Sequence, residues 1–274
     1  MSTNVPPAPV RLMARLLPIP AGAGLARMLF ERNVLVYRRG WVAFVSGFLE
    51  PVFYLFSLGI GLGALIGSVN YGGQLVPYAS FVAPAMLATS AMNGVVFDMV
   101  FMLFFKLRYN KIYESVLNTP LGVRDIAIGE SAWALVRSTI YATSFLIIAT
   151  IAGFVHSWWA LLAVPVAVLI GFACGSLAMA GTTWMRTHQD FDYLNLVLMP
   201  LFLLSATFYP LSTYPPSVQW LVQLSPLYHG VTLERDLMLG YIHPGLFVHA
   251  AVLALVGLLG LAIASRRLEK LLLS

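Results

Sequence analysis

Residues 106–130 read KLRYNKIYESVLNTPLGVRDIAIGE and form the longest charged interruption between the apolar runs of the chain. The first half of this stretch has helical periodicity, which predicts a short amphipathic helix over residues 109–117. Asn118-Thr119-Pro120 should end that helix, because a residue before proline is pushed out of the α region. A short helix between two membrane spans has an apolar face that needs a partner. That face comprises Tyr109, Ile112, Tyr113, Val116 and Leu117.

The composition is that of an integral membrane protein. Of the 274 residues, 59% are hydrophobic and only 10% are charged, whereas a soluble domain carries about 25% charged residues. The single cysteine, Cys174, excludes an internal disulfide. Basic side chains cluster beside apolar segments, which favours anchoring at a lipid surface over binding to nucleic acid.

Six apolar runs predict an all-α integral membrane protein with six transmembrane helices, because each run reaches or nearly reaches the ~20 residues that a span needs. Residues 1–21 are expected to be a disordered lead-in, and residues 22–274 to form a single transmembrane domain. Residues 22–39 predict an amphipathic interface helix on the inner membrane surface, although they can also be read as the wetted start of the first span. The predicted spans cover residues 41–64, 79–105, 128–154, 158–184, 193–209 and 245–265.

The connections between the spans set the expected orientation. Fourteen of the sixteen Lys and Arg residues lie in the N-terminal segment, the loop at 106–127, the link at 185–192 and the C-terminal tail. The links at 65–78 and 155–157 contain no Lys, Arg, Asp or Glu. The positive-inside rule therefore places both termini in the cytoplasm.

The link between the fifth and sixth spans, residues 207–244, is expected outside the cell and is unusually apolar. Pro215-Pro216 can open one short helix, and Ser225-Pro226 supplies an N-cap followed by proline for a second. Gly240 is a plausible stop for the second helix. This pattern predicts a re-entrant helical hairpin, which a membrane tolerates only where protein or a water-filled cavity surrounds it.

Several charged residues fall inside apolar runs. Glu50, in the middle of the first span, and Asp98, in the second, are costly in a bilayer and therefore usually face the bundle interior or a cavity. Glu50 fits a polar point on a substrate path or a subunit interface, and it equally fits a packing residue beside a proline kink. Glu130 and Arg137 lie about two turns apart on one face of the third span. They can pair with each other or, instead, with residues of neighbouring spans.

Three glycines, Gly59, Gly63 and Gly67, follow Glu50 at four-residue spacing. Such a stripe of small residues lets another helix approach closely. Packing within the chain is favoured over a seam between two copies.

The sequence gives no support for an enzyme. It lacks the GxxxxGK[ST] phosphate loop, and it has no HExxH motif. The five histidines show no ligand spacing, so no metal site is expected. Any ATP hydrolysis must therefore come from another chain.

Four segments together resemble permease subunits of type-2 ABC exporters, in the NodJ-like, lipo-oligosaccharide and drug-export branch. The motifs that carry the resemblance are L-x-T-P-L in the charged loop and S-x-x-F-Y-P…L-S-P-L…R-D-L-x-x-G near the end. Ala85 and Asp98 depart from the pattern, where glycine and glutamate are expected. The segments are LEPVFYLFSLGIGLGALIG (49–67), YASFVAPAMLATSAM (78–92), YESVLNTPLGVRDIAIGE (113–130) and MPLFLLSATFYPLSTYPPSVQWLVQLSPLYHGVTLERDLMLG (199–240).

The resemblance implies a permease without its own ATPase activity, in a bacterial cell membrane. It implies a separate ABC ATPase subunit that carries ATP and Mg²⁺, and a second permease that is either another copy or a related chain. The implied contacts with the ATPase are Tyr113, Glu114, Leu117, Thr119 and Pro120, with help from Arg27 and Glu31 on the interface helix. The implied substrate path is Glu50, Phe53, Tyr54, Phe56 and Asp98. The implied exit gate is Tyr209, Pro210, Pro226 and Arg235.

The expected activity is ATP-driven export of an amphipathic or lipid-linked substrate, such as a glycolipid, a lipo-oligosaccharide or a drug. A polysaccharide exporter of the same superfamily is an alternative. A proton-coupled secondary transporter, with Glu50 and Asp98 as relays, is a second alternative that the Thr-Pro segment disfavours. An intramembrane acyltransferase is disfavoured by the lack of a nucleophile or ligand constellation.

Overall fold

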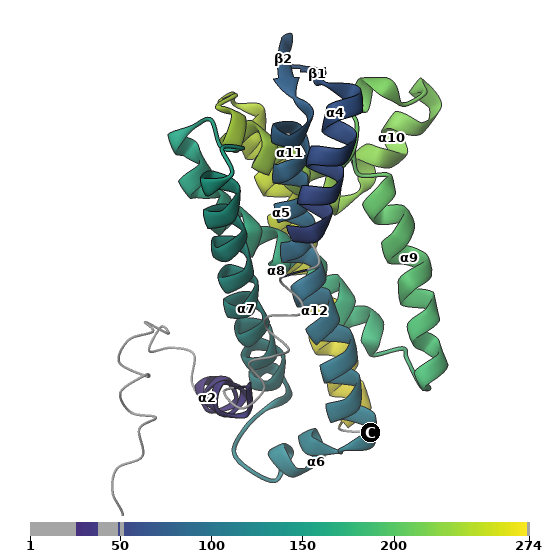
Figure 1. Cartoon of the computed structure of the whole chain (residues 1–274). Coiled ribbons are helices and arrows are strands. Elements are labelled where there is room, and N and C mark those ends of the chain that lie inside the picture. The colour runs from purple at the N-terminus through teal and green to yellow at the C-terminus, as the bar shows by residue number, and fades with distance from the viewer. Residues whose placement is uncertain (1–25, 38–48, 50–51, 273–274) are drawn as a thin grey trace, which may run out of the picture.

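The computed structural model describes residues 26–37, residue 49 and residues 52–272, and this part of the chain is mostly helical (Figure 1). Four helices in it are long and apolar enough to cross a membrane. Each coincides with a predicted span, which confirms a helical membrane protein. The four cover Tyr78–Tyr109, Val123–Ile151, Trp158–Thr182 and Gly245–Leu272.

Five helices pack into the central bundle, and small residues set how closely they approach. A Cβ atom added at Gly175 would lie 2.2 Å from a methyl group of Val95, and one added at Gly260 would lie 2.8 Å from the backbone of Ser176. Without a strong hydrophobic force between helices in lipid, such close backbone packing is a main source of association. The five are α5 (Tyr78–Phe97), α7 (Val123–Ile151), α8 (Ala163–Thr182), α11 (Pro226–Leu239) and α12 (Gly245–Leu272).

Two of these helices extend beyond their predicted bounds toward the charged loop. Helix α5 continues through the π-helical turns η2 (Asp98–Met102) and η3 (Phe105–Tyr109). Helix α7 begins at Val123 instead of residue 128, because the Asp125 carboxylate accepts a hydrogen bond from the N–H of Gly122 at 2.9 Å. A carboxylate in the first turn also suits the positive end of the helix dipole.

The described part of the first predicted span is helical over residues 52–56, then η1 (Ser57–Leu62) and α4 (Gly63–Ile66). Glu50 lies outside the described residues. Of the predicted glycine stripe, only Gly59 makes a close approach, with Ala79 of α5 at 3.4 Å from its added Cβ position. Gly63 and Gly67 have no neighbour within 4 Å of that position. Among the described residues, the stripe therefore forms no continuous groove.

The fifth predicted span is shorter than expected. Helix α9 covers Phe191–Leu203, 13 residues, which is about 20 Å against a hydrocarbon core of ~30 Å. The chain leaves the helix at Leu204 and turns through Ala206, whose φ is +54°. Prediction of a helix to residue 209 is wrong, because the backbone oxygens of Ala206 and Thr207 are turned toward Arg235. Figure 1 shows α9 standing apart from the bundle.

A β-hairpin occupies the charge-free link at 65–78, where the sequence suggested only a loop. Strands β1 (Ser68–Tyr71) and β2 (Gln74–Pro77) pair antiparallel, with Tyr71 opposite Gln74. Gly72 and Gly73 form the two-residue turn, with φ of +60° and +83°. That turn type requires positive φ at both positions, which glycine adopts without strain.

The two helices of the outer hairpin form as predicted. Helix α10 (Pro216–Leu224) and α11 each have proline in the first turn, and the Ser225 hydroxyl accepts from the N–H of Tyr228. Gly240 ends α11 with a φ of +88°. Helix α11 is mostly buried against the bundle, whereas α10 lies at its edge. Insertion of this hairpin into the outer leaflet stays a prediction.

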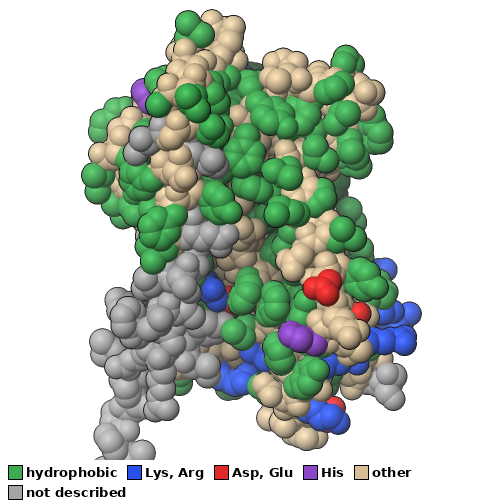
Figure 2. All heavy atoms as spheres, turned by 45° about the vertical axis from the view of Figure 1, so that its right-hand side comes forward, with side chains coloured by type: hydrophobic (Ala, Val, Ile, Leu, Met, Phe, Trp, Pro, Cys, Tyr) green, Lys and Arg blue, Asp and Glu red, His purple; other side chains and the backbone are tan. Residues whose placement is uncertain are grey.

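Basic side chains gather at one end of the molecule, which we call the basic end. In the view of Figure 2 all visible Lys and Arg side chains lie in the lower half, and hydrophobic side chains cover the upper half. The basic end carries the C-terminal residues, α2 (Ala26–Tyr37) and α6 (Ile112–Leu117), whereas β1, β2 and α10 lie at the opposite end (Figure 1). This polarity is the one that the charge distribution predicted.

The interface helix at the basic end differs in detail from its prediction. Helix α2 crosses α7 and buries Leu29, Phe30 and Asn33, and the Phe30 ring packs edge-on against Trp133 at 5.8 Å. The apolar side chain of Met28, on the same helix, is 60% exposed. The buried face is therefore set by contact with α7 rather than by the hydrophobic stripe of the helix alone.

Candidate coupling site and transport path

The predicted coupling helix is divided in two. Lys111 adopts the left-handed conformation with a φ of +47°, so η3 ends at Tyr109 and α6 begins at Ile112. Tyr109 is 61% exposed, whereas Tyr113 is fully buried. A single helix over 109–117 is therefore wrong, and the apolar face of α6 packs back onto its own chain.

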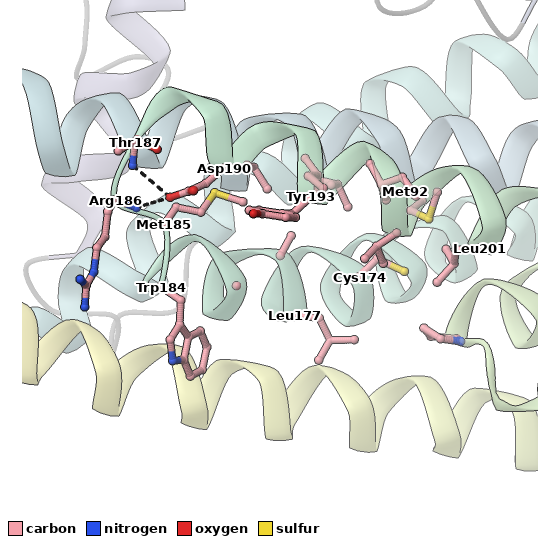
Figure 3. A pocket seen from close by; sticks show the side chains of 18 residues that line it. Met92, Cys174, Leu177, Trp184, Met185, Arg186, Thr187, Asp190, Tyr193 and Leu201 are labelled. Atoms are coloured by element: carbon pink, nitrogen blue, oxygen red, sulfur yellow. Dashed lines mark hydrogen bonds between the residues drawn. The ribbon is translucent and has the colours of Figure 1, made fainter.

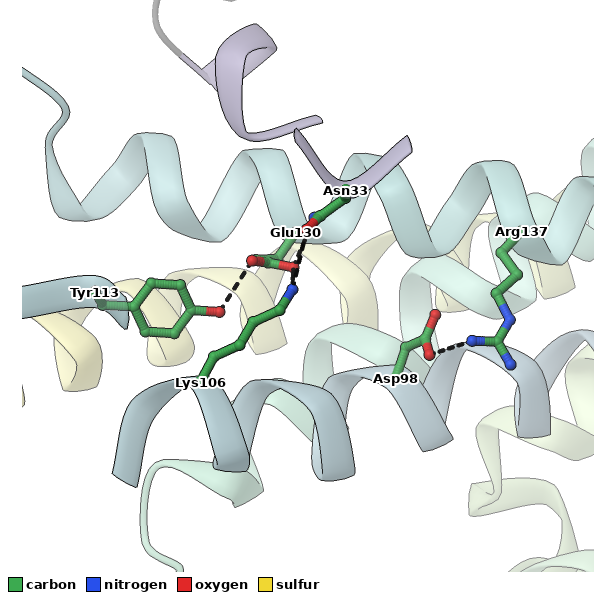
Figure 4. Close-up of polar contacts among 6 residues, drawn as sticks. All are labelled: Asn33, Asp98, Lys106, Tyr113, Glu130 and Arg137. Carbon is green, nitrogen blue, oxygen red and sulfur yellow. Dashed lines mark hydrogen bonds and ion pairs between the residues drawn. The ribbon is translucent and has the colours of Figure 1, made fainter. Parts of the chain in front are cut away.

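Glu130 of α7 contacts three other segments at the basic end (Figure 4). Its carboxylate accepts hydrogen bonds from Asn33 Nδ2 at 3.0 Å, from Lys106 Nζ at 2.6 Å and from the Tyr113 hydroxyl at 3.0 Å. Lys106 Nζ also donates to Asn33 Oδ1 at 3.2 Å. Because these partners lie on α2, η3 and α6, one carboxylate ties three separate segments to α7.

We define the Glu130 cluster as Glu130, Asn33, Lys106 and Tyr113. The cluster is largely buried, and its two charged groups, Lys106 and Glu130, form an ion pair. The side chains of Lys106 and Glu130 are only 13% and 5% exposed. Burial raises the pKa of Tyr113 well above its ordinary value, and the Glu130 carboxylate adds to this rise. The tyrosine therefore stays protonated and keeps donating to the carboxylate. Buried charges stay paired in this way because an unpaired one is costly.

The predicted ATPase contacts divide into an inward and an outward set. Tyr113 points inward and offers no surface to a partner, which corrects its expected role as a direct contact. Glu114, Thr119 and Pro120 are exposed at the basic end, and Leu117 is partly exposed. Glu114 pairs with Lys111 on the surface at 3.4 Å. Of the two predicted α2 residues, Glu31 is partly buried and the Arg27 side chain lies outside the described set.

Asp98 lies in an intramolecular ion pair. Its carboxylate accepts a hydrogen bond from the Arg137 guanidinium, between η2 and α7, and both side chains are buried (Figure 4). The Arg137 Nε also donates to the Tyr141 hydroxyl at 3.1 Å. Glu130 and Arg137 thus each pair with the neighbouring span, whose η3 and η2 turns carry Lys106 and Asp98. This is one of the two arrangements that the sequence left open. Asp98 does not line the cavity at Tyr54, and its place on the substrate path stays a prediction.

Tyr54 lines a cavity of about 440 Å³ beside α9. Asn93 of α5 and Asn195 of α9 supply polar groups to its wall. Phe53 and Phe56, the other predicted path residues of this helix, are exposed and do not line it. Sequence reasoning missed the two asparagines, although an amide inside an apolar run is a usable signal.

Arg235 anchors the predicted exit gate. Its guanidinium is buried, donates from Nε to the Phe81 oxygen at 3.1 Å and from one terminal nitrogen to the Ala206 oxygen at 3.0 Å. It also lies 3.8 Å from the centre of the Phe81 ring. Tyr209 stacks near Tyr214 at 4.8 Å, and Pro226 starts α11. Pro210 precedes the short η6 turn (Leu211–Thr213).

Replacing Arg235 by lysine should destabilise this junction even though the charge is kept. An ammonium group cannot donate in the planar fork that reaches two separate backbone segments and stacks on Phe81. We expect a loss of about 2 kcal/mol or more in unfolding free energy, because hydrogen bonds to charged groups are worth ~1.5–3 kcal/mol. Thermal unfolding of the purified variant measures this loss, and an unchanged melting temperature would contradict the anchoring role.

Comparison with known proteins identifies the family of this chain. Residues 25–239 match the family described as ABC-2 type transporter. The chain belongs to this family. Among its relatives, Nodulation protein J of Rhizobium leguminosarum bv. viciae is 35% identical over 86% of this chain and 91% of that protein. Nodulation protein J of Neorhizobium galegae is 34% identical over 92% and 97%.

A more distant member is the inner membrane transport permease YadH of Escherichia coli strain K12, 25% identical over 78% of this chain and 82% of that protein. The family match and the apolar helices establish a multi-pass membrane permease of the ABC transporter class. Among the described residues, no group of three or more His, Cys, Asp or Glu side chains could hold a metal ion.

Proposed function

We propose that this chain is the transmembrane subunit of an ATP-driven exporter that moves an amphipathic or lipid-linked substrate out of the cytoplasm or inner leaflet. The observation that carries the proposal is the Glu130 cluster. It fixes α2 and α6 to α7 at the basic end, which the positive-inside rule places in the cytoplasm. A force applied to the α6 surface is thereby delivered directly to a transmembrane helix.

A separate ABC ATPase subunit would bind at Glu114, Thr119 and Pro120 and would carry ATP and Mg²⁺. ATP binding can shift the permease only through a difference in affinity between two arrangements of the complex. The buried hydroxyl of Tyr113, bonded to Glu130, makes α6 a stiff element for transmitting that difference. A second permease, a copy or a related chain, would complete the path.

Two features support an amphipathic cargo. The cavity at Tyr54 combines aromatic walls with the amides of Asn93 and Asn195, and α9 beside it is apolar on nearly every face. Helices that are apolar all round lie against lipid or against other helices. A proton relay through Asp98 is less compatible with these features, because Asp98 is engaged by the Arg137 guanidinium.

Replacing Glu114 by lysine should uncouple the ATPase from transport. The side chain is exposed and its ion pair with Lys111 is a surface pair, so the fold should be unaffected. Coupling energies between sites are typically ~1–3 kcal/mol, so we expect ATP-driven export to fall about tenfold. Export by vesicles that contain the permease and its ATPase measures the effect.

The matched control is Glu269→Lys, which reverses another exposed acid at the same end, on α12. It should leave export unchanged. Equal export by the Glu114→Lys variant and the unmodified protein would argue against α6 as the docking element.

A further inference from the structure

A second, larger cavity of about 680 Å³ forms a groove between α9 and the α5–α8 face of the bundle. Its walls are almost entirely apolar, with Val96, Leu177 and Val197 on three different helices. The volume lies in the ~300–1,000 Å³ range of ligand sites. Apart from Pro226, no residue predicted for the coupling site, the substrate path or the exit gate lines this groove.

The two ends of the groove differ in character (Figure 3). Arg186, Thr187 and Asp190 lie at one end, and Leu201 lies at the other. From residue 190 to residue 201 a helix rises about 16 Å. That length is about half of the ~30 Å hydrocarbon core, so the groove is as deep as one leaflet.

Three arginines surround the polar end. Arg186 lines it, Arg108 donates from Nε to the Met185 oxygen at 3.3 Å, and the Arg267 guanidinium lies 4.5 Å from the centre of the Trp184 ring. Residues 184–186 are therefore contacted by the guanidinium groups of Arg108 from η3 and Arg267 from α12, and Arg186 adds a third. No ion pair of these arginines is found within the part of the chain that the structure describes.

The acid that lines this end does not neutralise it. The Asp190 carboxylate accepts hydrogen bonds from the backbone N–H groups of Arg186 at 2.6 Å and Thr187 at 3.0 Å. These bonds hold the pKa of Asp190 below its ordinary value, so the group caps its own turn. The polar end of the groove therefore carries three guanidinium groups and only one carboxylate, that of Asp190, so its net charge is positive.

We propose that this groove holds one acyl chain of an anionic phospholipid from the cytoplasmic leaflet, with its phosphate between Arg186 and Arg108. Guanidinium groups bind phosphate through short, charge-assisted hydrogen bonds, and an apolar slot one leaflet deep fits the attached chain. A protein helix docked here would bury the same arginines without a partner, which is costly. The proposal rests on the expected orientation of the basic end and is independent of the direction of transport.

Trp184 lines the groove and reports on its contents. The fluorescence of Trp184 is measured in phosphatidylcholine vesicles. The protein used is a variant in which phenylalanine replaces the other five tryptophans. Brominated chains are carried either by phosphatidylglycerol or by an equal fraction of phosphatidylcholine. We expect brominated phosphatidylglycerol to be enriched about thirtyfold at Trp184, the size expected for two basic side chains near an anionic lipid. The five replaced residues are Trp41, Trp133, Trp158, Trp159 and Trp220.

The Arg186→Gln variant should lose the preference for phosphatidylglycerol, whereas Arg266→Gln, at an exposed arginine that does not line the groove, should keep it. Equal quenching by the two lipids overturns the proposal, because it indicates unselective contact. Absence of quenching by either lipid overturns it too, because protein then covers the groove. Native mass spectrometry of the protein purified from its own membranes should find bound phospholipid, and a glycolipid in its place would assign the groove to cargo instead.

Discussion

Replacing Glu130 by alanine should release α2 and α6 together and lower the free energy of unfolding by about 3–5 kcal/mol, the usual cost of leaving one partner of a buried ion pair alone. Lys106 would keep its charge in a site where its side chain is only 13% exposed. The Tyr113 hydroxyl would lose its acceptor as well. Thermal unfolding measures the stability, and ATP-driven export measures the coupling.

A second substitution separates the cost of the stranded charge from the loss of the cluster. Lys106→Met in the Glu130→Ala background should recover part of the stability, because the unpaired ammonium group is gone. It should not recover export, because α2 and α6 remain detached from α7. Full export by the stable double variant would show that the Glu130 cluster has no part in coupling.

The Asp98–Arg137 pair should behave differently, because it joins η2 to α7 inside the bundle and away from the docking surface. Arg137→Met alone leaves the Asp98 carboxylate without its cation, and we expect a loss of about 3–5 kcal/mol. Asp98→Leu combined with Arg137→Met should be close to the unmodified protein in stability, because apolar replacement of both partners is often neutral or stabilising.

Export distinguishes a structural role for this pair from a role as a proton relay. If Asp98 serves packing, the stable double variant should export at a rate near that of the unmodified protein. If Asp98 relays protons, the double variant should be inactive despite its stability. Export by reconstituted vesicles, compared at equal protein content, decides between these outcomes.

Long apolar runs and local capping residues were the most predictable parts of the fold. The spans at 79–105, 128–154, 158–184 and 245–265 each correspond to a long helix, because the length of the hydrocarbon core dictates the length of the run. Ser225 and Gly240 also have the predicted capping roles. Both kinds of signal are local, so one sequence carries them in full.

Features that depend on a distant partner were not predictable. The early end of α9 follows from the contact of Arg235 with the backbone near Ala206, and the direction of Tyr113 follows from Glu130. Neither pair is adjacent in sequence. The β-hairpin at 68–77 did carry a local signal, since Gly72-Gly73 between short apolar segments is typical of a two-residue turn.

The candidate site was predicted as a segment rather than as an arrangement. A short helix before Pro120 was predicted and is present as α6, although it is shorter than expected. Its role as the docking surface stays a prediction. The sequence of the charged loop could not show which side chains face outward, because Lys111 breaks the helix and rotates α6 relative to Tyr109. Asn33 was missed because a single amide on an amphipathic helix reads as part of its polar face.

Cross-linking from the loop tests most directly whether this permease is driven through α6 and Pro120. The native Cys174 is replaced by serine, and a photoreactive maleimide is attached to a Thr119→Cys variant co-expressed with a candidate ABC ATPase subunit from the same organism. We expect cross-links to the ATPase from position 119 and none from Ser212→Cys in η6 at the opposite end. Cross-links from position 212 alone, or from neither position in a complex that hydrolyses ATP and exports, would contradict the proposed coupling site.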